Sequence, residues 1–240
     1  MKYFCVSDIH GHFDVLFDCL LEARWNTEDD NHHLIVIGDM TDRGPQNKEV
    51  LEFVAELVTN KKATLIMGNH DIFLRNFFVG DFSRTVFDIE RNGHGFTLSQ
   101  LLDKEITVDT DFKDESLVMN KKYPQIRNLL SSDRYYLELG NYILVHGGID
   151  GSLDNWREDT IRNFTWHKQS ELKGVKGKTI VCGHKQNITI REPKDYKKYL
   201  KEPALYLDKF DILHRDGVIH IDGSVCDTKK INVLVLDITM

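Results

Sequence analysis

The sequence lacks long apolar runs and an export signal. Its aliphatic runs are only a few residues long, as in Leu34–Ile37, whereas a membrane-spanning helix needs about 18 or more apolar residues. The amino-terminal segment reaches an acid at Asp8, before the apolar core of a signal peptide could form. We therefore expect a soluble, cytoplasmic protein with no membrane segment.

Cysteine is also scarce, and acidic residues outnumber basic ones. The four cysteines, Cys5, Cys19, Cys182 and Cys226, are widely spaced and form no C-x-x-C pair, so neither a thiolate metal site nor a dithiol redox motif is indicated. We expect them to be buried free thiols. The formal net charge of -7 argues against general nucleic-acid binding, because such binding needs a basic face that releases counterions.

What the sequence does contain is enough apolar material for a sizeable core. The 240 residues are 41% hydrophobic and 29% charged, which excludes disorder as the main theme. No repeat, long linker or low-complexity tract marks a boundary, so we expect one domain over residues 1–240.

The first third of the chain alternates between strand and helix patterns, which is typical of β-α-β units around a parallel sheet. Aliphatic runs predict strands over 3–6, 34–37 and 63–67. Apolar residues at helical spacing predict helices over 13–21 and 47–58, and a third helix opens near Asp71.

The rest of the chain is less regular. Residues 80–132 are charged and poorly periodic, and we expect mostly helical cover over the core, with a turn at Asn92–Gly95. A hairpin is expected from strands 135–138 and 142–145, followed by strands 179–182, 218–221 and 231–236. Residues 191–202 carry five basic and three acidic side chains, which favours a solvated surface loop.

Potential metal ligands follow five of the predicted strands. Because ligand sites of open α/β sheets lie beyond the carboxyl ends of the strands, residues distant in sequence converge there. Packing alone does not account for five strand ends that share Asp, Asn and His chemistry. The predicted ligands are Asp8, His10, Asp39, Asn69, His146 and His184.

These ligand types indicate a class of metal and a reaction. Oxygen and imidazole ligands without thiolate favour Mn, Fe or Zn, with Mn as the first expectation. Six ligands exceed the need of one tetrahedral ion, and Asp39 can bridge two, so we expect two divalent metal ions. Such a pair binds a phosphate ester and generates a bridging hydroxide for in-line attack.

Three further side chains accompany the predicted ligands. Arg43 places a planar guanidinium where it can hold two phosphate oxygens. His70 is a candidate acid that protonates the leaving alkoxide, and Asp42 is expected to orient its ring and favour its protonated form. His94 has no motif support, and we expect it in the core or on the surface rather than as a ligand.

The motifs together resemble those of the calcineurin-like metallophosphoesterases. More narrowly they resemble the phosphoprotein phosphatase branch, which includes bacterial and phage serine/threonine phosphatases and symmetrical diadenosine tetraphosphate hydrolases. The turn Asp222–Ser224 resembles the final strand turn of that branch. The segments that carry the resemblance are Ser7–Gly11, Gly38–Gly44, Gly68–Asp71, Val145–Gly148 and Gly183–His184.

The resemblance implies an α/β fold in which two mixed β-sheets form a sandwich flanked by helices, as a single catalytic domain. It implies one ion on Asp8, His10 and Asp39, and another on Asp39, Asn69, His146 and His184. It also implies that Arg43 grips phosphate while Asp42 and His70 serve the leaving group. Where the branch often has Trp-x-Arg, this chain has Trp166-His167-Lys168, and Lys168 offers a point charge instead of a bidentate fork.

Three functions follow as hypotheses. The first is a phosphatase for phosphoserine or phosphothreonine in proteins, with small phosphoesters as artificial substrates. The alternative is a symmetrical bis(5'-nucleosyl)-tetraphosphatase that uses the same core. The third, favoured least because the ligand set is intact, is a non-catalytic phosphate-binding scaffold. The sequence leaves the oligomeric state open.

Overall fold

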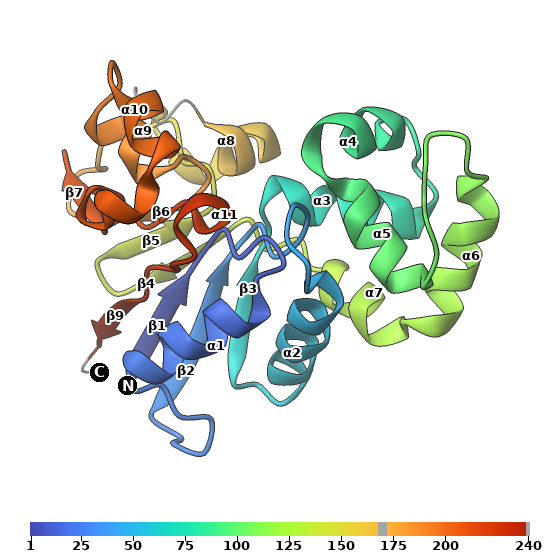
Figure 1. Ribbon diagram of the computed structural model, residues 1–240. Helices are drawn as coiled ribbons and strands as arrows, with labels where there is room; N and C mark the ends of the chain where they lie inside the picture. The colour runs from blue at the N-terminus through green and yellow to red at the C-terminus, as the bar shows by residue number, and fades with distance from the viewer. Residues whose placement is uncertain (168–171, 239–240) are drawn as a thin grey trace.

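Two β-sheets form the centre of the computed structural model, which describes residues 1–167 and 172–238 (Figure 1). The first sheet has the strand order β3-β2-β1-β9, in which β1, β2 and β3 are parallel and β9 is antiparallel to β1. Its strands are β1 (Lys2–Val6), β2 (His32–Ile37), β3 (Ala63–Ile66) and β9 (Leu234–Asp237).

The second sheet has the order β4-β5-β6-β8-β7. Its three inner strands are parallel, and each outer strand is antiparallel to its neighbour. The strands are β4 (Tyr136–Leu139), β5 (Tyr142–Val145), β6 (Thr179–Cys182), β8 (Val218–His220) and β7 (Leu213–Arg215).

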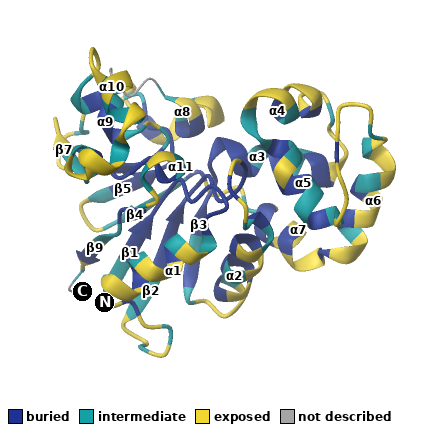
Figure 2. Cartoon of the chain, in the orientation of Figure 1, coloured by how far each residue is buried: buried dark blue, intermediate teal, exposed yellow. Residues whose placement is uncertain are grey.

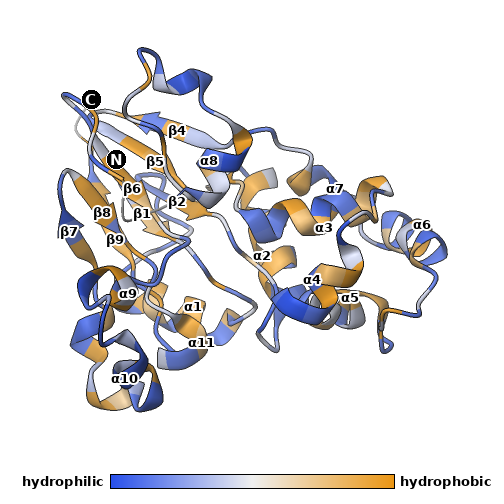
Figure 3. Cartoon of the chain, turned by 90° about the horizontal axis from the view of Figure 1, so that it is seen from above, coloured by the Kyte–Doolittle hydropathy of each residue, from blue (hydrophilic) through white to orange (hydrophobic). Residues whose placement is uncertain are grey.

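Alternation of side chains along the strands divides the core into two layers. In β2, Ile35 and Ile37 point between the sheets, whereas Leu34 and Val36 point to the outer, helix-covered face. The same period of two runs along the other inner strands, where Leu144 and Val181 face Cys5 of the first sheet. The fold is therefore the predicted α/β sandwich of two mixed sheets, and most of its strand residues are apolar (Figure 3).

Two groups of helices cover the sheets. Helix α1 (Phe13–Glu22) buries Leu16 and Leu20, one turn apart, and α2 (Asn47–Thr59) buries an apolar stripe. Helices α3 to α7 form a lobe beside the first sheet, in contact with α2 (Figure 1). They are α3 (Asn69–Val79), α4 (Thr85–Asn92), α5 (His94–Leu102), α6 (Phe112–Lys122) and α7 (Pro124–Leu130).

Short elements surround the second sheet. They are the helices α8 (Ile161–Trp166), α9 (Asn187–Arg191), α10 (Tyr196–Lys201) and α11 (Val225–Thr228), and the 3-10 turns η1 (Trp156–Glu158), η3 (Pro203–Leu205) and η4 (Leu207–Phe210). None of the helices within residues 1–167 and 172–238 combines the length and apolar character that a membrane crossing requires.

Most predicted elements are present within one or two residues of their expected bounds. Of the turn expected over 92–95, only Gly93 lies outside a helix, because Asn92 ends α4 and His94 begins α5, and the chain bends at the left-handed Gly93 (φ 81°). The prediction of a loop over 191–202 was wrong in part, since residues 196–201 form α10, although none of that helix is buried. The prediction of four buried cysteines holds for Cys5 and Cys182, whereas Cys19 and Cys226 are only half-buried.

Candidate active site

The loops after β1, β2, β3, β5 and β6 converge at one edge of the sandwich, and most of their residues are buried (Figure 2). Several of these loop residues have positive φ, among them Asp8 (52°), His10 (44°), Asp39 (56°) and His184 (65°). Such backbone strain is held in place by surrounding structure and clusters at functional sites. The structure thus brings all six predicted ligands to one place.

Asp39 lies at the centre of this cluster. Its Oδ2 atom is 3.3 Å from Nε2 of His146 and 3.9 Å from Nε2 of both His10 and His70. Possible ligand atoms within 4.8 Å of one another form two groups: His10, Asp39 and His70, and Asp39, His146 and His184. Because Asp39 belongs to both groups, one carboxylate can bridge two cations.

The other predicted ligands adjoin these groups. Oδ1 of Asn69 is 3.2 Å from Nε2 of His146. Oδ2 of Asp8 accepts hydrogen bonds from the backbone N–H of His184 (2.9 Å) and from the hydroxyl of Ser7 (2.7 Å). The spatial grouping differs from the sequence expectation in one respect: the residue grouped with His10 and Asp39 is His70, while Asp8 contacts the loop that carries His184.

Two histidines are oriented as metal-binding imidazoles usually are. Nδ1 of His10 donates to the carbonyl of Thr41, and Nδ1 of His146 donates to the carbonyl of Ile37, both at 2.8 Å. Since a carbonyl only accepts, each ring keeps its Nδ1 proton, and loss of the Nε2 proton to a binding cation would leave the lone pair on Nε2, which faces Asp39. The residues present therefore fit divalent cations.

The electrostatics of the cluster favour positive charge beside Asp39. Burial lowers the pKa of His146, but the carboxylates of Asp39 and Asp8 outweigh it and raise that pKa to about 10. Burial, assisted by the neighbouring His146, lowers the pKa of His184 to about 3, which leaves its ring neutral and able to bind a metal ion.

Arg43 lies against the ligand group that contains His10 and His70. Its Nη1 atom donates to Nε2 of His10 (3.1 Å), and its Nη2 atom donates to Nε2 of His70 (3.2 Å). The side chain is exposed on its outer side. A guanidinium here can meet an anion that enters the site.

His70 and Asp42 form the expected pair. Nδ1 of His70 donates to Oδ2 of Asp42 at 2.6 Å, and both side chains are buried. Burial lowers the pKa of His70, but Asp39 and Asp42 outweigh it, and the net direction is upward. The arrangement keeps His70 ready to carry a proton next to Asp39.

Sequence reasoning missed the support behind Asp42. The other carboxylate oxygen, Oδ1, accepts from Nδ1 of His94 (3.1 Å) and from the hydroxyl of Thr97 (2.5 Å). His94 is buried, as one of the two expected alternatives had it, but it contacts the site rather than only filling the core. In the sequence, the position of His94 directly after Asn92-Gly93 was the one feature that could have pointed to this role.

The carboxylate of Asp71 fixes the loop that carries Asp39. Its oxygens accept from the backbone N–H groups of Gly68 (2.8 Å), Asp39 (3.0 Å) and Met40 (3.1 Å). Gly68 also has to be glycine, because a Cβ atom there would lie 2.4 Å from Oδ1 of Asp39. The ligand loops after β2 and β3 are therefore packed against each other without spare room.

Aromatic rings line the mouth of the cluster. Trp166 packs between Phe73 (centroids 6.1 Å apart) and His184 (5.2 Å). Phe73 in turn contacts His70 (5.1 Å). Lys168, the possible substitute for a second phosphate-binding arginine, lies outside the described residues.

The fold together with this cluster defines the protein as a metal-dependent phosphoesterase. The chain belongs to the calcineurin-like phosphoesterase family, whose family model matches residues 1–221.

Several curated relatives carry dinucleotide hydrolase names. An asymmetrical bis(5'-nucleosyl)-tetraphosphatase of Bacillus cereus is 42% identical over 87 residues, or 33% of this chain and 35% of that protein. The enzyme of the same name from Anoxybacillus flavithermus is 24% identical over 85% of this chain and 76% of its own length. A symmetrical bis(5'-nucleosyl)-tetraphosphatase of Nitrosospira multiformis is 28% identical over 72% of this chain and 52% of its own length.

Solved structures show the same fold. A protein provisionally described as a diadenosine tetraphosphatase matches with a TM-score of 0.59 at 16% identity, over 98% of this chain and 89% of its own. A cold-active protein-tyrosine phosphatase of a Shewanella species matches with a TM-score of 0.58 at 19% identity, over 98% and 75%.

Proposed function

We propose that this chain hydrolyses a dinucleoside polyphosphate with two divalent metal ions. The metal-binding part of the proposal rests on Asp39. Its carboxylate belongs to two groups of possible ligand atoms and lies next to His70. The substrate class is supported by the relatives, which are named for both symmetrical and asymmetrical cleavage of bis(5'-nucleosyl)-tetraphosphates. The position of cleavage is left to experiment.

In this proposal Asp8, His10 and Asp39 hold one ion, and Asp39, Asn69, His146 and His184 hold the other. Manganese is the first ion to test and iron or zinc the next, since the ligands are oxygen and imidazole. When bound, the ions supply an activated water and positive charge for the phosphate oxygens.

The residues of the chain provide the remaining steps. Arg43 binds and orients the phosphoryl group through its two Nη atoms, which lie between His10 and His70. His70 delivers a proton from Nε2 to the leaving oxygen in its doubly protonated form, in which Nδ1 is held by Asp42 and Nε2 no longer accepts from Arg43. His94 and Thr97 act through Asp42 as positioning residues.

A substrate comparison tests the proposal. We expect diadenosine tetraphosphate to be cleaved with a higher kcat/KM than a phosphoserine peptide, in parallel assays with Mn, Fe, Zn and Mg. Chromatography of the nucleotide products distinguishes two ADP from ATP plus AMP. A higher kcat/KM for the phosphopeptide would overturn the substrate assignment and restore the protein phosphatase hypothesis.

A further inference from the structure

A hollow of about 470 Å³ opens beside the candidate metal site. It shares Trp166 and His184 with the aromatic mouth of that site, so the hollow adjoins the site at these two side chains. Its size falls within the range that organic ligands occupy in proteins. A substrate whose phosphate lies at Asp39 can thus extend past His184 into this hollow.

The charge of the lining is positive, although the chain as a whole is acidic. Lys173, Lys185 and Arg215 line the hollow, against one acid, Asp216. Asp216 already pairs with Nε of Arg215 (3.3 Å), and Nη1 of Arg215 donates to the carbonyl of Ile190 (3.2 Å). Arg215 is therefore anchored, and the two lysines are exposed cations beside the path to the metal site.

Part of the remaining lining is apolar or aromatic. Trp166 is 40% exposed, whereas the other two tryptophans, Trp25 and Trp156, are 6% and 7% exposed. Leu172 and Ile190 add buried aliphatic surface. An exposed indole next to aliphatic side chains provides a face on which a nucleobase can stack.

One buried polar side chain completes the lining. His220 is 2% exposed, and its Nδ1 is 3.4 Å from Sγ of Cys182. Burial, with a smaller effect from Arg215, lowers the pKa of His220 to about 4. The ring is neutral at pH 7, so it can exchange hydrogen bonds with an uncharged base or sugar.

From this combination we propose that the hollow is a nucleotide subsite. It takes a nucleoside whose base lies against Trp166 and whose phosphates pass Lys173 and Lys185 on the way to the metal site. The inference rests on the proposed function and deepens it, because it says which residues distinguish a dinucleotide from a simple phosphoester. An extended phosphopeptide has no nucleobase to stack on Trp166 and fewer phosphates to pair with the two lysines, so it gains less from this cavity than a dinucleotide does.

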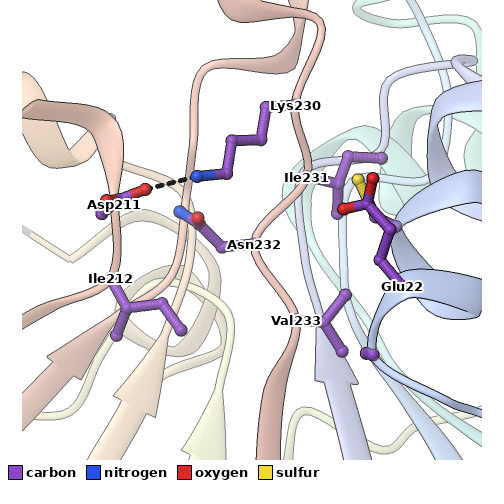
Figure 4. Close-up of a pocket in the computed structure, with 9 residues that line it drawn as sticks. Glu22, Asp211, Ile212, Lys230, Ile231, Asn232 and Val233 are labelled. Atoms are coloured by element: carbon purple, nitrogen blue, oxygen red, sulfur yellow. Dashed lines mark hydrogen bonds and ion pairs between the residues drawn. The ribbon is translucent and has the colours of Figure 1, made fainter. Parts of the chain in front are cut away.

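A second hollow, of about 430 Å³, lacks this chemistry (Figure 4). Among its described lining residues the single cation, Lys230, is paired with Asp211 at 2.5 Å. It shares no described lining residue with the candidate active site. This second hollow therefore offers no alternative position for the nucleotide.

The kinetic test uses the metal-loaded full chain and two substrates. We expect the double variant Lys173→Glu, Lys185→Glu to raise KM for diadenosine tetraphosphate about tenfold relative to KM for an aryl phosphate. The double variant Lys176→Glu, Lys201→Glu is the matched control, because both are exposed lysines that do not line the hollow and the net charge changes equally. An unchanged KM ratio in the double variant would overturn the subsite.

A binding test uses ADP and pyrophosphate as probes. Since Trp166 is the exposed tryptophan, we expect ADP to quench the tryptophan emission and pyrophosphate to leave it unchanged. Trp166→Phe should lose this quenching while it keeps a stacking ring for catalysis. Equal quenching by the two probes, or quenching that persists in Trp166→Phe, would contradict stacking at this position.

The two assignments fail in different ways. An enzyme that cleaves the aryl phosphate and the phosphopeptide but leaves diadenosine tetraphosphate intact overturns the proposed function. An enzyme that cleaves the dinucleotide with an unchanged KM ratio in the lysine variant overturns the subsite alone. A raised KM for the phosphopeptide in that variant, without dinucleotide cleavage, assigns the hollow to a peptide and overturns both.

Discussion

Nδ1 of His94 lies 3.1 Å from Oδ1 of Asp42, on the opposite side of the carboxylate from His70. Nε2 of His94 has no hydrogen-bond partner among the described residues. The carboxylate accepts but does not donate, so Nδ1 of His94 carries a proton and donates it to Asp42. This buried ring therefore links α5 to the catalytic pair.

Replacing His94 tests that link. We expect His94→Leu to lower kcat about tenfold, because Asp42 loses a buried hydrogen bond and holds His70 less firmly. The loss should be larger for substrates with poor leaving groups, which depend most on the proton from His70. Rates on a series of aryl phosphates of increasing leaving-group pKa measure this.

His94→Asn is the matched variant, since its amide can keep a donor near the position of Nδ1. It should recover part of the rate on poor leaving groups. A uniform loss across the series in both variants would mean that His94 only supports packing.

Removing the shared carboxylate tests the two-metal site. We expect Asp39→Asn to lower kcat by roughly a hundredfold or more and to reduce the bound metal per chain, because the bridging charge is lost. Metal analysis after dialysis, with circular dichroism to confirm folding, gives the readout. Asp114→Asn, at an exposed position of α6, controls for loss of one carboxylate. Near-normal turnover of Asp39→Asn would refute the mechanism.

A crowded glycine offers a test that changes no ligand. A Cβ atom at Gly183 would lie 2.2 Å from Oδ2 of Asp8 and 2.4 Å from Oγ of Ser7. We expect Gly183→Ala to displace Asp8 and to reduce metal affinity about tenfold or more, measured by titration calorimetry. At Gly151 the nearest atom is 3.8 Å away, so Gly151→Ala should bind metal as the wild type does. Equal affinities for both variants would show that the position of Asp8 is unimportant.

The buried His220 predicts a stability change with pH. Its pKa is about 4 in the folded chain and about 6.5 when unfolded, so the unfolded chain binds the extra proton between these values. The free energy of unfolding therefore falls as pH drops from about 6.5 to 4. Between pH 6.5 and 4, the free energy of unfolding of His220→Gln should fall by about 1–3 kcal/mol less than that of the wild type, as measured by urea titration.

His214→Gln is the control for that measurement, because His214 is an exposed histidine on β7, the neighbouring strand. Its stability should follow the wild type over the same pH range. If the free energy of unfolding of His220→Gln changes with pH as that of the wild type does, burial of the neutral ring does not contribute to the pH dependence of stability.

The sequence was sufficient for the sheets because their strands are short, apolar and bounded by turns. Strand 179–182 was predicted with the bounds that the structure has. The positions of Asp39, His146 and His184 followed from strand ends meeting at one edge. Among the strands of residues 1–167 and 172–238, only β7 (Leu213–Arg215) was missed, since its three residues are mostly exposed and give no periodic signal.

The hydrogen bonds that His94 and Thr97 donate to Asp42 could not be predicted from the sequence, for a physical reason. His94 and Thr97 lie more than 50 positions from Asp42, on α5, whose packing against α2 decides where they point. The hollow beside Trp166 is likewise assembled from four separate segments. Such contacts depend on helix packing angles, which apolar periodicity does not encode.

The pairing of β1 with β9 has a consequence for synthesis of the protein. Tyr3 pairs with Leu236, and the backbone of Met1 exchanges hydrogen bonds with that of Ile238. A ribosome releases β1 more than 200 residues before its second neighbour, so one edge of the ligand-bearing strand stays unpaired for most of translation. Open strand edges invite pairing with other chains. We expect slow elongation before the codons of β9 to increase aggregation, and chaperone binding during this interval to suppress it.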